Sequence, residues 1–381
     1  MKIAVVNTYP LRSKLDQPFG FSQWTFTHRE TTLVNIQTDD GLEGWGEAYG
    51  PARLTAAVAR DFLAPLVVGR DPRDTESVWE MLFARSLDYG QKGVVLAAIS
   101  AIDIALWDIK ARAAGVPLYR LLGGAKTESV RCYATGFYFG GEERLEDRFA
   151  REAKQYLADG FRAMKMKVGL GVERDAELVA QLREVIGPGI RLMVDANHAY
   201  NPVEAVALGR RIEQHDIYWF EEPVSPLSID GYLEVKSKLA IPLAGGEAEY
   251  TRFGFEPWLR RRAFDFAQPD ICACGGVSES MKIAALASVH GVHVTPHAWG
   301  SAVGQSAALH FYAARPRHPS TTTAEDKLIE CDRTESPFRT TIVANPIRFE
   351  GGAWFLPDGP GLGIEVIREQ VERFVVREGE R

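Results

Sequence analysis

The chain has little cysteine, no long apolar run and no excess of positive charge. Four cysteines in 381 residues do not make a disulfide framework. No stretch of about 18 apolar residues occurs, so we predict no membrane-spanning helix. A net charge of −7, without a run of lysine and arginine, argues against a nucleic-acid partner. The first residues lack the apolar core of a signal peptide, and we expect a cytoplasmic protein.

Two regions of the chain differ in pattern. Residues 1–125 combine two predicted strands, 2–12 and 31–41, with three helical stretches. Residues 126–344 alternate apolar strands with helices, which is typical of a (β/α) barrel. We expect the final segment, 345–381, to pack back across the first domain. The sequence therefore predicts a barrel with one accessory domain, as its length allows.

Polar residues recur at regular steps in the second region. Asp195, Glu221 and Glu247 follow one another at steps of 26 residues, and each ends an apolar run that predicts a buried strand. Asp270 and His297 continue the series after 23 and 27 residues. One βα unit takes about 31 residues in a barrel of ~250 residues. The spacing predicts that these side chains lie at the carboxyl ends of consecutive strands, where barrel enzymes keep their active sites.

Two lysines lie on one strand of the same series. Lys165 and Lys167 are two residues apart, so their side chains point to the same side of a strand. Adjacent ammonium groups lower each other's pKa, which is a route to a neutral lysine base near pH 7. An exposed strand edge with two lysines is the alternative. Their place in the series favours a catalytic function.

Three carboxylates at the ends of neighbouring strands would repel one another. At ~4 Å and an effective dielectric constant of about 20, each pair costs about 4 kcal/mol. A bound cation removes this cost, and all-oxygen ligands favour Mg²⁺ first and Mn²⁺ second. We therefore predict a metal site at Asp195, Glu221 and Glu247, with salt bridges to arginine or lysine as the alternative. Asn197, close to Asp195, is a candidate substrate contact.

His297 and Asp270 form a candidate acid–base pair. A carboxylate bonded to one ring nitrogen fixes the tautomer and raises the basicity of the other nitrogen. A helix cap is the alternative for His297. His198 lies close enough to the rim to be a weaker candidate for substrate contact. Glu330, in the last predicted strand, would donate a hydrogen bond to an oxyanion if protonated, and Asp332 is its rival for this role.

One divalent ion between two bases suits a particular reaction. The arrangement fits removal of a proton from the carbon next to a carboxylate. Such a carbon acid is very weak, so the cation must stabilise the negative charge that develops. The residues therefore predict a metal-dependent enzyme that acts on a small carboxylic acid.

The motifs together resemble the enolase superfamily, and within it the mandelate racemase subgroup. The resemblance runs over nearly the whole chain. It implies a modified (β/α)7β barrel under an α+β capping domain formed by residues 1–125 and 345–381. It also implies Mg²⁺ at the three carboxylates, bases at Lys167 and at the pair of His297 with Asp270, and a homo-oligomer. The motifs that carry it are K-M-K (165–167), D-A-N (195–197), F-E-E-P (220–223), G-G-E (245–247), Q-P-D (268–270) and T-P-H (295–297).

The resemblance also implies substrate contacts and a reaction class. Capping-domain loops around residues 19–24 and 49–53 would select the substrate, which gives as candidates Phe21, Trp24 and Tyr49, together with Trp299 beside the T-P-H motif. CACGGVSE and PDGPGLGIE are similar to members that open galactarolactone or dehydrate acid sugars. We expect β-elimination from a sugar acid or its lactone to a 3-deoxy-2-keto acid. A racemase or epimerase that uses both bases is the alternative, and a barrel that only binds a metal and a sugar acid is the third reading.

Overall fold

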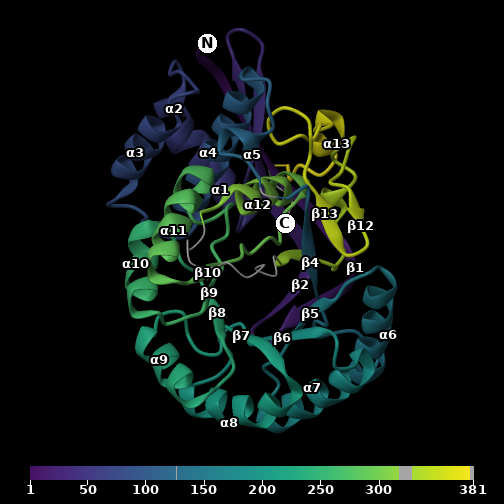
Figure 1. Cartoon of the computed structure of the whole chain (residues 1–381). Coiled ribbons are helices and arrows are strands. Elements are labelled where there is room, and N and C mark those ends of the chain that lie inside the picture. The colour runs from purple at the N-terminus through teal and green to yellow at the C-terminus, as the bar shows by residue number, and fades with distance from the viewer. Residues whose placement is uncertain (126, 317–327, 378–381) are drawn as a thin grey trace.

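A ring of parallel strands surrounded by helices forms the larger part of the molecule (Figure 1). The computed structural model describes residues 1–125, 127–316 and 328–377. Neighbouring strands pair in chain order from β4 to β10, and β11 pairs with β4. The strands are β4 (Ser129–Gly136), β5 (Ala163–Lys167), β6 (Arg191–Asp195), β7 (Ile217–Glu221), β8 (Leu243–Gly245), β9 (Phe266–Ala267), β10 (His293–Val294) and β11 (Leu328–Asp332).

The helices that follow these strands cover the outside of the ring (Figure 1). Their apolar residues recur every three or four positions: α7 buries Leu178, Leu182 and Ile186. The helix α8 begins at a capping box, in which Asn201 and Glu204 bond each other's backbone. The helices are α6 (Leu145–Ala158), α7 (Val172–Ile186), α8 (Pro202–Ile212), α9 (Ile229–Lys238), α10 (Thr251–Arg261), α11 (Gly276–His290) and α12 (Ala302–Ala314).

The interior of the ring is filled in layers. One layer is apolar and buried, and it draws residues from six strands: Tyr133, Ala163, Met193, Trp219, Ala244 and Leu328. Side chains alternate along a strand, so the residue two positions later points inward one layer higher. Five strands place a polar or charged residue there, and all five are buried: Thr135, Lys165, Asp195, Glu221 and Glu330. The barrel core therefore supports a charged layer at the carboxyl ends of its strands.

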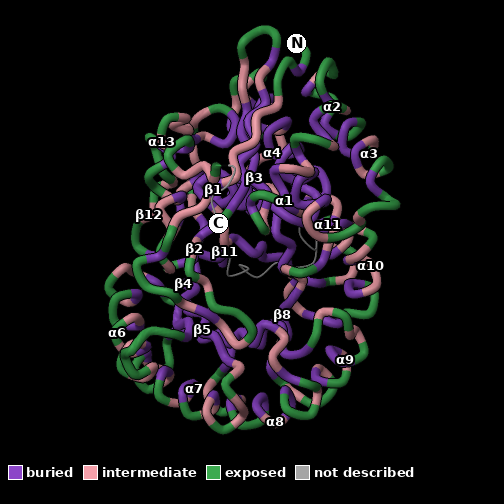
Figure 2. Tube along the Cα trace, turned by 180° about the vertical axis from the view of Figure 1, so that it is seen from behind, coloured by how far each residue is buried: buried purple, intermediate pink, exposed green. Residues whose placement is uncertain are grey.

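An antiparallel sheet and a helical group form the accessory domain. The sheet consists of β1 (Ile3–Phe21), β2 (Trp24–Thr38) and β3 (Glu43–Ala48). The helix α4 (Val94–Ala113) packs on β3 and is buried over most of its length (Figure 2). Its carboxylates are satisfied: Asp103 accepts hydrogen bonds from Ser278, and Asp108 from the backbone of Trp45 and Leu362. The other helices are α1 (Ala52–Ala57), α2 (Ala64–Val67), α3 (Thr75–Ser86) and α5 (Leu118–Leu121), with a π-helical turn at Val58–Leu63.

The C-terminal segment contacts both regions. β13 (Ala353–Phe355) pairs with β12 (Phe349–Glu350) and lies antiparallel to β4. After α13 (Arg368–Glu372), the chain runs beside β1, where the Arg12 amide donates to the Phe374 carbonyl at 2.9 Å. The described part of the C-terminal segment therefore ends against the first sheet, where the Val376 amide donates to the Pro10 carbonyl at 2.8 Å.

The first sheet differs from its prediction in length. Strands predicted over 2–12 and 31–41 extend to Ile3–Phe21 and Trp24–Thr38, and a two-residue turn at Ser22 and Gln23 joins them. The predicted loop at residues 19–24 is therefore the tip of a β-hairpin. Aromatic residues explain the extension, because Phe19 and Phe26 pair across the strands with ring centroids 5.5 Å apart.

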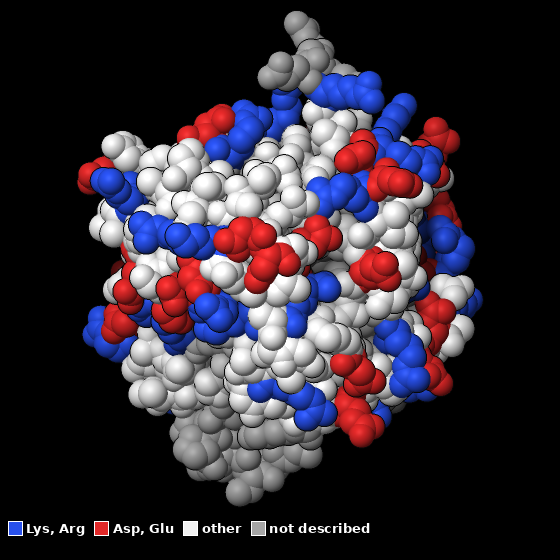
Figure 3. All heavy atoms as spheres, turned by 90° about the horizontal axis from the view of Figure 1, so that it is seen from above, with Lys and Arg blue, Asp and Glu red and all other residues white. Residues whose placement is uncertain are grey.

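Acidic and basic side chains are interspersed over the face in Figure 3, without a continuous basic area. None of the described helices is long and apolar enough to cross a membrane.

We predict that Gly46 is essential for the packing of β3 on α4. A Cβ atom at Gly46 would lie 1.8 Å from the Ala101 carbonyl oxygen, so a helix backbone would have to move. Replacing Gly46 by Ala should destabilise the protein by about 2 kcal/mol or more. The control is Gly189→Ala, because no atom lies within 4 Å of the added Cβ. Thermal and urea unfolding of both variants test this, and equal stabilities would contradict it.

Candidate active site at the carboxyl ends of the barrel strands

The two lysines of β5 lie among carboxylates. Lys165 forms ion pairs with Glu221, with Asp195 at 3.3 Å and with Glu330 at 3.2 Å. Lys167 Nζ lies 2.6 Å from Asp195 and 2.7 Å from the side-chain oxygen of Asn197. The prediction that both lysines point to one side of the strand is confirmed by this shared partner.

The expected lowering of pKa is wrong for Lys165. Burial lowers the pKa of Lys165, but Glu221 and Glu330 outweigh burial and raise the pKa well above its ordinary value. The prediction considered only the neighbouring ammonium group, whereas the fold surrounds Lys165 with acids. Lys165 is therefore a fixed positive charge in this arrangement.

The three predicted metal ligands converge. Asp195, Glu221 and Glu247 each offer a carboxylate oxygen, and these atoms all lie within 4.8 Å of one another. Trp219 Nε1 and Gln268 Nε2 donate to one oxygen of Glu221, at 2.9 and 2.7 Å. Burial and the nearby Asp195 raise the pKa of Glu221 to about 8. The cluster therefore concentrates negative charge where the sequence predicts a cation.

Unpaired acceptors beside this cluster test whether a cation fits. Both carboxylate oxygens of Glu222 are buried without a hydrogen-bond partner, as is Oε1 of Gln268. Buried acceptors without partners are rare, because each costs about 1–3 kcal/mol. Burial, Glu247 and Asp195 raise the pKa of Glu222 well above its ordinary value. Lys165 and Lys167 balance part of this negative charge, and the all-oxygen donor set that remains fits a hard divalent ion such as Mg²⁺.

The predicted pairing of His297 with Asp270 is confirmed. Nδ1 of His297 lies 2.5 Å from Asp270, and Nε2 lies 3.7 Å from Glu247. The other oxygen of Asp270 accepts from the Cys272 amide at 2.7 Å, which fixes the carboxylate. Burial lowers the pKa of His297, but Glu247, Glu330 and Asp270 outweigh it and raise the pKa to about 10. The cap of α12 is Ser301, so His297 is not a helix cap.

Glu330 and Asp332 have separate partners on β11. Glu330 accepts hydrogen bonds from Thr135 at 2.6 Å and from the Ala298 amide at 2.9 Å. Burial raises the pKa of Glu330, but Lys165 and His297 outweigh it and lower the pKa to about 2. The condition for donation by Glu330, a protonated carboxyl group, is therefore not met in this arrangement, because Lys165 and His297 favour the carboxylate. Asp332 instead forms a buried ion pair with Arg29, at 2.8 Å.

The predicted substrate contacts divide into two groups. Phe21 lies 5.9 Å from Lys167 Nζ, and the ring of Tyr49 lies 5.6 Å from His297 and 6.4 Å from Trp299. These three aromatic residues and Asn197 are near the proposed bases. Two other candidates have no such contact: Trp24 is 62% exposed on the hairpin tip, and the carbonyl of His198 accepts a bond from Gln23 of that tip.

Two residues near the site, Tyr138 and Arg29, were not predicted from the sequence. Together with Trp299 they form a group that is called the roof of the site below. The ring of Tyr138 lies 5.0 Å from Lys167 Nζ, and Arg29, from β2, stacks 3.6 Å above the Trp299 ring. Nη1 of Arg29 and Nε1 of Trp299 are buried donors without a partner. Arg29 stands between His28 and Glu30 in the stretch HRETTLVNI, so its charge does not single it out in the sequence. Its partners, Trp299 and Asp332, are about 270 to 300 residues away along the chain, so no local pattern predicts where Arg29 lies.

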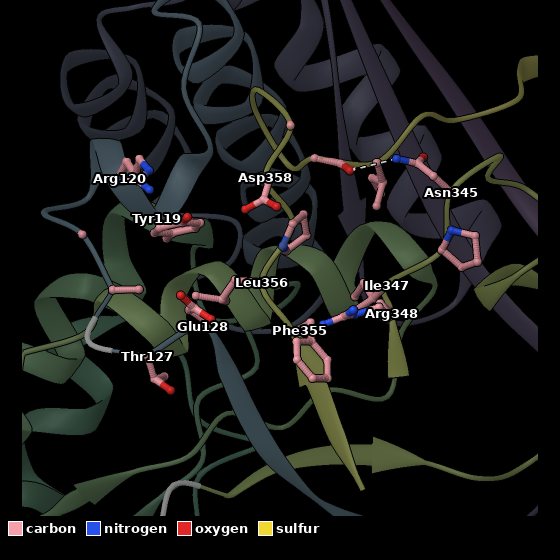
Figure 4. Close-up of a pocket in the computed structure, with 17 residues that line it drawn as sticks. Tyr119, Arg120, Thr127, Glu128, Asn345, Ile347, Arg348, Phe355, Leu356 and Asp358 are labelled. Carbon is pink, nitrogen blue, oxygen red and sulfur yellow. Dashed lines mark hydrogen bonds between the residues drawn. The ribbon is translucent and has the colours of Figure 1, made fainter. Parts of the chain in front are cut away.

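A separate groove lies away from these residues. Its volume is about 930 Å³, and its lining includes Tyr119, Arg120, Glu128, Arg348 and Asp358 (Figure 4). Glu128 directly precedes β4, so the groove lies at the amino end of that strand. Acidic and basic residues both line it, and none of the predicted site residues does.

Family models match both parts of the chain. The model for the mandelate racemase / muconate lactonizing enzyme N-terminal domain matches residues 3–123. The model described as enolase C-terminal domain-like matches residues 148–371. Both matches agree with the resemblance that the motifs indicate.

Named relatives and solved structures cover nearly the whole chain. The D-galactarolactone cycloisomerase of Agrobacterium fabrum is 46% identical, over 98% of this chain and 99% of that protein. The arabinonate dehydratase of Saccharolobus solfataricus is 35% identical, over 88% of each. The structure of the 3,6-anhydro-D-galactonate cycloisomerase from Zobellia galactanivorans has a TM-score of 0.90 and 41% identity, with 99% of this chain and 100% of that one covered.

A structure with metal is also similar. A racemase from Streptomyces coelicolor with bound magnesium has a TM-score of 0.88 and 30% identity, with 98% of this chain and 100% of that one covered. The expected fold, a modified (β/α)7β barrel with an α+β capping domain, is confirmed by these likenesses and by the sheets described above. The chain therefore belongs to the mandelate racemase / muconate lactonizing enzyme family and is an enzyme of the enolase superfamily.

Proposed function

We propose that the protein is a Mg²⁺-dependent cycloisomerase or dehydratase that removes the proton α to the carboxylate of a sugar acid or its lactone. β-Elimination to a 3-deoxy-2-keto acid follows. The observation that carries the proposal is a pair of bases flanking one acidic cluster. Lys167, on β5, contacts Asp195, and His297, after β10, lies 3.7 Å from Glu247. The ligands themselves lie on or directly after the strands between these two, β6 to β8.

Asp195, Glu221 and Glu247 would hold the metal ion. When bound, Mg²⁺ supplies positive charge that stabilises the substrate carboxylate oxygens as the α-proton leaves. The ammonium group of Lys165, held by Glu221 and Glu330, adds a second fixed positive charge at this end of the substrate. A weak carbon acid needs such charge stabilisation more than it needs a strong base.

The two bases act at defined atoms. Asp270 accepts the Nδ1 proton of His297, so proton transfer on that side occurs at Nε2, the nitrogen that faces Glu247. Proton transfer on the other side occurs at Nζ of Lys167, which Asn197 orients by a 2.7 Å hydrogen bond. One base takes the α-proton, and the opposite group is placed to give a proton to the departing β-oxygen.

Two observations support a sugar acid or lactone as substrate. The relatives named above act on galactarolactone, arabinonate and 3,6-anhydro-D-galactonate, which are oxygen-rich carboxylic compounds or their lactones. The roof of this site has unpaired donors on Arg29 and Trp299, and these suit hydroxyl, carbonyl or carboxylate oxygens at the far end of such a substrate.

We predict that the protein binds Mn²⁺, as a stand-in for Mg²⁺, through the three carboxylates. Replacing Glu221 by Gln should weaken Mn²⁺ binding at least tenfold, because one anionic ligand is lost. The loss of the free Mn²⁺ signal in electron paramagnetic resonance measures binding without any substrate. Glu184→Gln is the matched control, since Glu184 is exposed on α7. Equal affinities of the two variants would contradict the metal site.

We predict that galactarolactone or a related lactone or sugar acid, incubated with protein and Mg²⁺ in D₂O, loses its β-oxygen substituent. Proton NMR should show one deuterium at the new methylene carbon. Lys167→Ala and His297→Asn should each lower turnover by about 10²–10⁴-fold, which is the usual contribution of a positioned acid or base. The control is Lys154→Ala, because Lys154 is exposed on α6.

The position of the deuterium also distinguishes β-elimination from the alternative reaction, racemisation or epimerisation. Deuterium at the α-carbon with the β-substituent retained would identify a racemase or epimerase, for which the two bases on opposite sides are sufficient. Full turnover in both single-base variants would overturn the assignment of the bases.

We also infer that the protein is a homo-oligomer. Large apolar side chains remain exposed near the carboxyl ends of β6, β7 and β8, including Val203 at 73%, Leu227 at 90% and Phe253 at 58%. A contiguous group of such side chains marks a protein interface, and we propose that these three belong to one. Light scattering should give a multiple of the monomer mass, and Leu227→Asp should shift it toward the monomer. A monomeric wild-type protein at micromolar concentration would contradict this.

A further inference from the structure

The end of β3 reaches from the capping domain onto the segment that carries His297. Glu47 lies near the end of β3 (Glu43–Ala48) and is only 1% exposed. Its carboxylate accepts bonds from the Ser301 amide at 2.8 Å, the Ser301 hydroxyl at 2.5 Å and the Gly304 amide at 2.7 Å. Thr31, on the neighbouring strand, donates to it at 2.7 Å. Glu47 therefore binds the amino end of the barrel helix α12, where anions are stabilised.

The barrel helix leaves room for this carboxylate. A Cβ atom at Gly300 would lie 2.8 Å from Glu47, and one at Gly304 would lie 2.7 Å from it. Both distances are too short for an ordinary contact, so glycine at these positions permits the close approach. The first turn of α12 and Glu47 therefore fit each other.

The residues beside Glu47 reach both members of the His297–Asp270 pair. The Tyr49 ring lies edge-on to His297, with centroids 5.6 Å apart. The Tyr49 amide donates to the Cys272 carbonyl at 2.9 Å, and the Cys272 amide in turn donates to Asp270 at 2.7 Å. Residues 47–49 are thus joined to the loop of Asp270 and to the segment after His297.

We propose that Glu47 is a positioning residue for the His297 base. Its bonds to Ser301 and Gly304 fix the start of α12, four residues after His297, and hold Tyr49 against the imidazole ring. No comparable link from Glu47 reaches Lys167, which lies on the other side of the site. The proposal rests on the two-base function proposed above, and it predicts that loss of the Glu47 bonds impairs one base and spares the other.

The chain offers a matched control in Asp103. Asp103 is also a buried capping-domain carboxylate, and it also binds the first turn of a barrel helix, through the Ser278 amide at 2.9 Å and hydroxyl at 2.6 Å. Its partner helix is α11, which does not carry His297. Asp103→Asn therefore removes the same kind of interaction without touching the His297 segment.

Single-base variants make the test selective. In a Lys167→Ala background, residual α-proton exchange in D₂O depends on His297, and in a His297→Asn background it depends on Lys167. We expect Glu47→Gln to lower the first exchange rate at least tenfold and to change the second less than twofold. Asp103→Asn should change neither rate by more than twofold. Equal losses in the two backgrounds would show a general structural role and overturn the proposal.

A second measurement does not need turnover. With ¹⁵N-labelled histidine, the Nδ1 proton that His297 shares with Asp270 is assigned by its absence in His297→Asn. Glu47→Gln should shift or broaden this signal, Glu47→Asp should do so less, and Asp103→Asn should leave it unchanged. If wild type gives no exchange with any sugar acid or lactone, the proposed function fails, and this signal still decides the role of Glu47. An unchanged signal in folded Glu47→Gln would overturn that role.

Discussion

Burial of like charge at the carboxyl ends of the barrel strands is the constraint on which the rest of the structure depends. Asp195, Glu221 and Glu330 are at most 1% exposed, and they stand on an apolar layer that cannot solvate them. Charges in such surroundings are stable only when they are paired or bind a metal. Lys165 and Lys167 supply part of the positive charge, and the unpaired oxygens of Glu222 show that part is still lacking. The excess of buried negative charge lowers the stability of the folded protein, and the same excess favours binding of a cation.

Three buried charged residues of the capping domain bind the barrel near this charged layer. Arg29 pairs with Asp332 at the end of β11, Glu47 binds the first turn of α12, and Asp103 binds the first turn of α11. Each is a buried polar contact with specific geometry, so the cap can sit in only one position on the barrel. Arg29 of the roof belongs to the capping domain, whereas Tyr138 and Trp299 belong to the barrel. The position of the capping domain on the barrel therefore also determines the shape of the space above the bases.

The barrel and the capping domain contribute different residues to the site, and this separation suits a family whose members act on different substrates. In the function proposed above, proton removal depends on barrel residues: the two lysines of β5, the three carboxylates that would hold a metal ion, and the pair of His297 with Asp270. The cap contributes Phe21, Arg29 and Tyr49, which contact the bases or the residues around them. Relatives named as a cycloisomerase and as a dehydratase align with most of this chain. Under the proposed function, the barrel residues determine the reaction class, and the cap residues over them determine which substrate fits.

The sequence by itself determined the barrel, the order of its strands and the convergence of its charged residues. It could do so because strand ends recur at a nearly constant spacing, and alternate residues on a strand share a face, as Lys165 and Lys167 do. Only the tertiary structure decided the charge states and the roof. The pKa of Lys165 is raised and that of Glu330 lowered because each lies beside the other and beside acids or a histidine from other strands. Arg29 and Glu47 find partners about 250 to 300 residues away. Such pairings depend on how the cap sits on the barrel, and no local pattern in the chain encodes that.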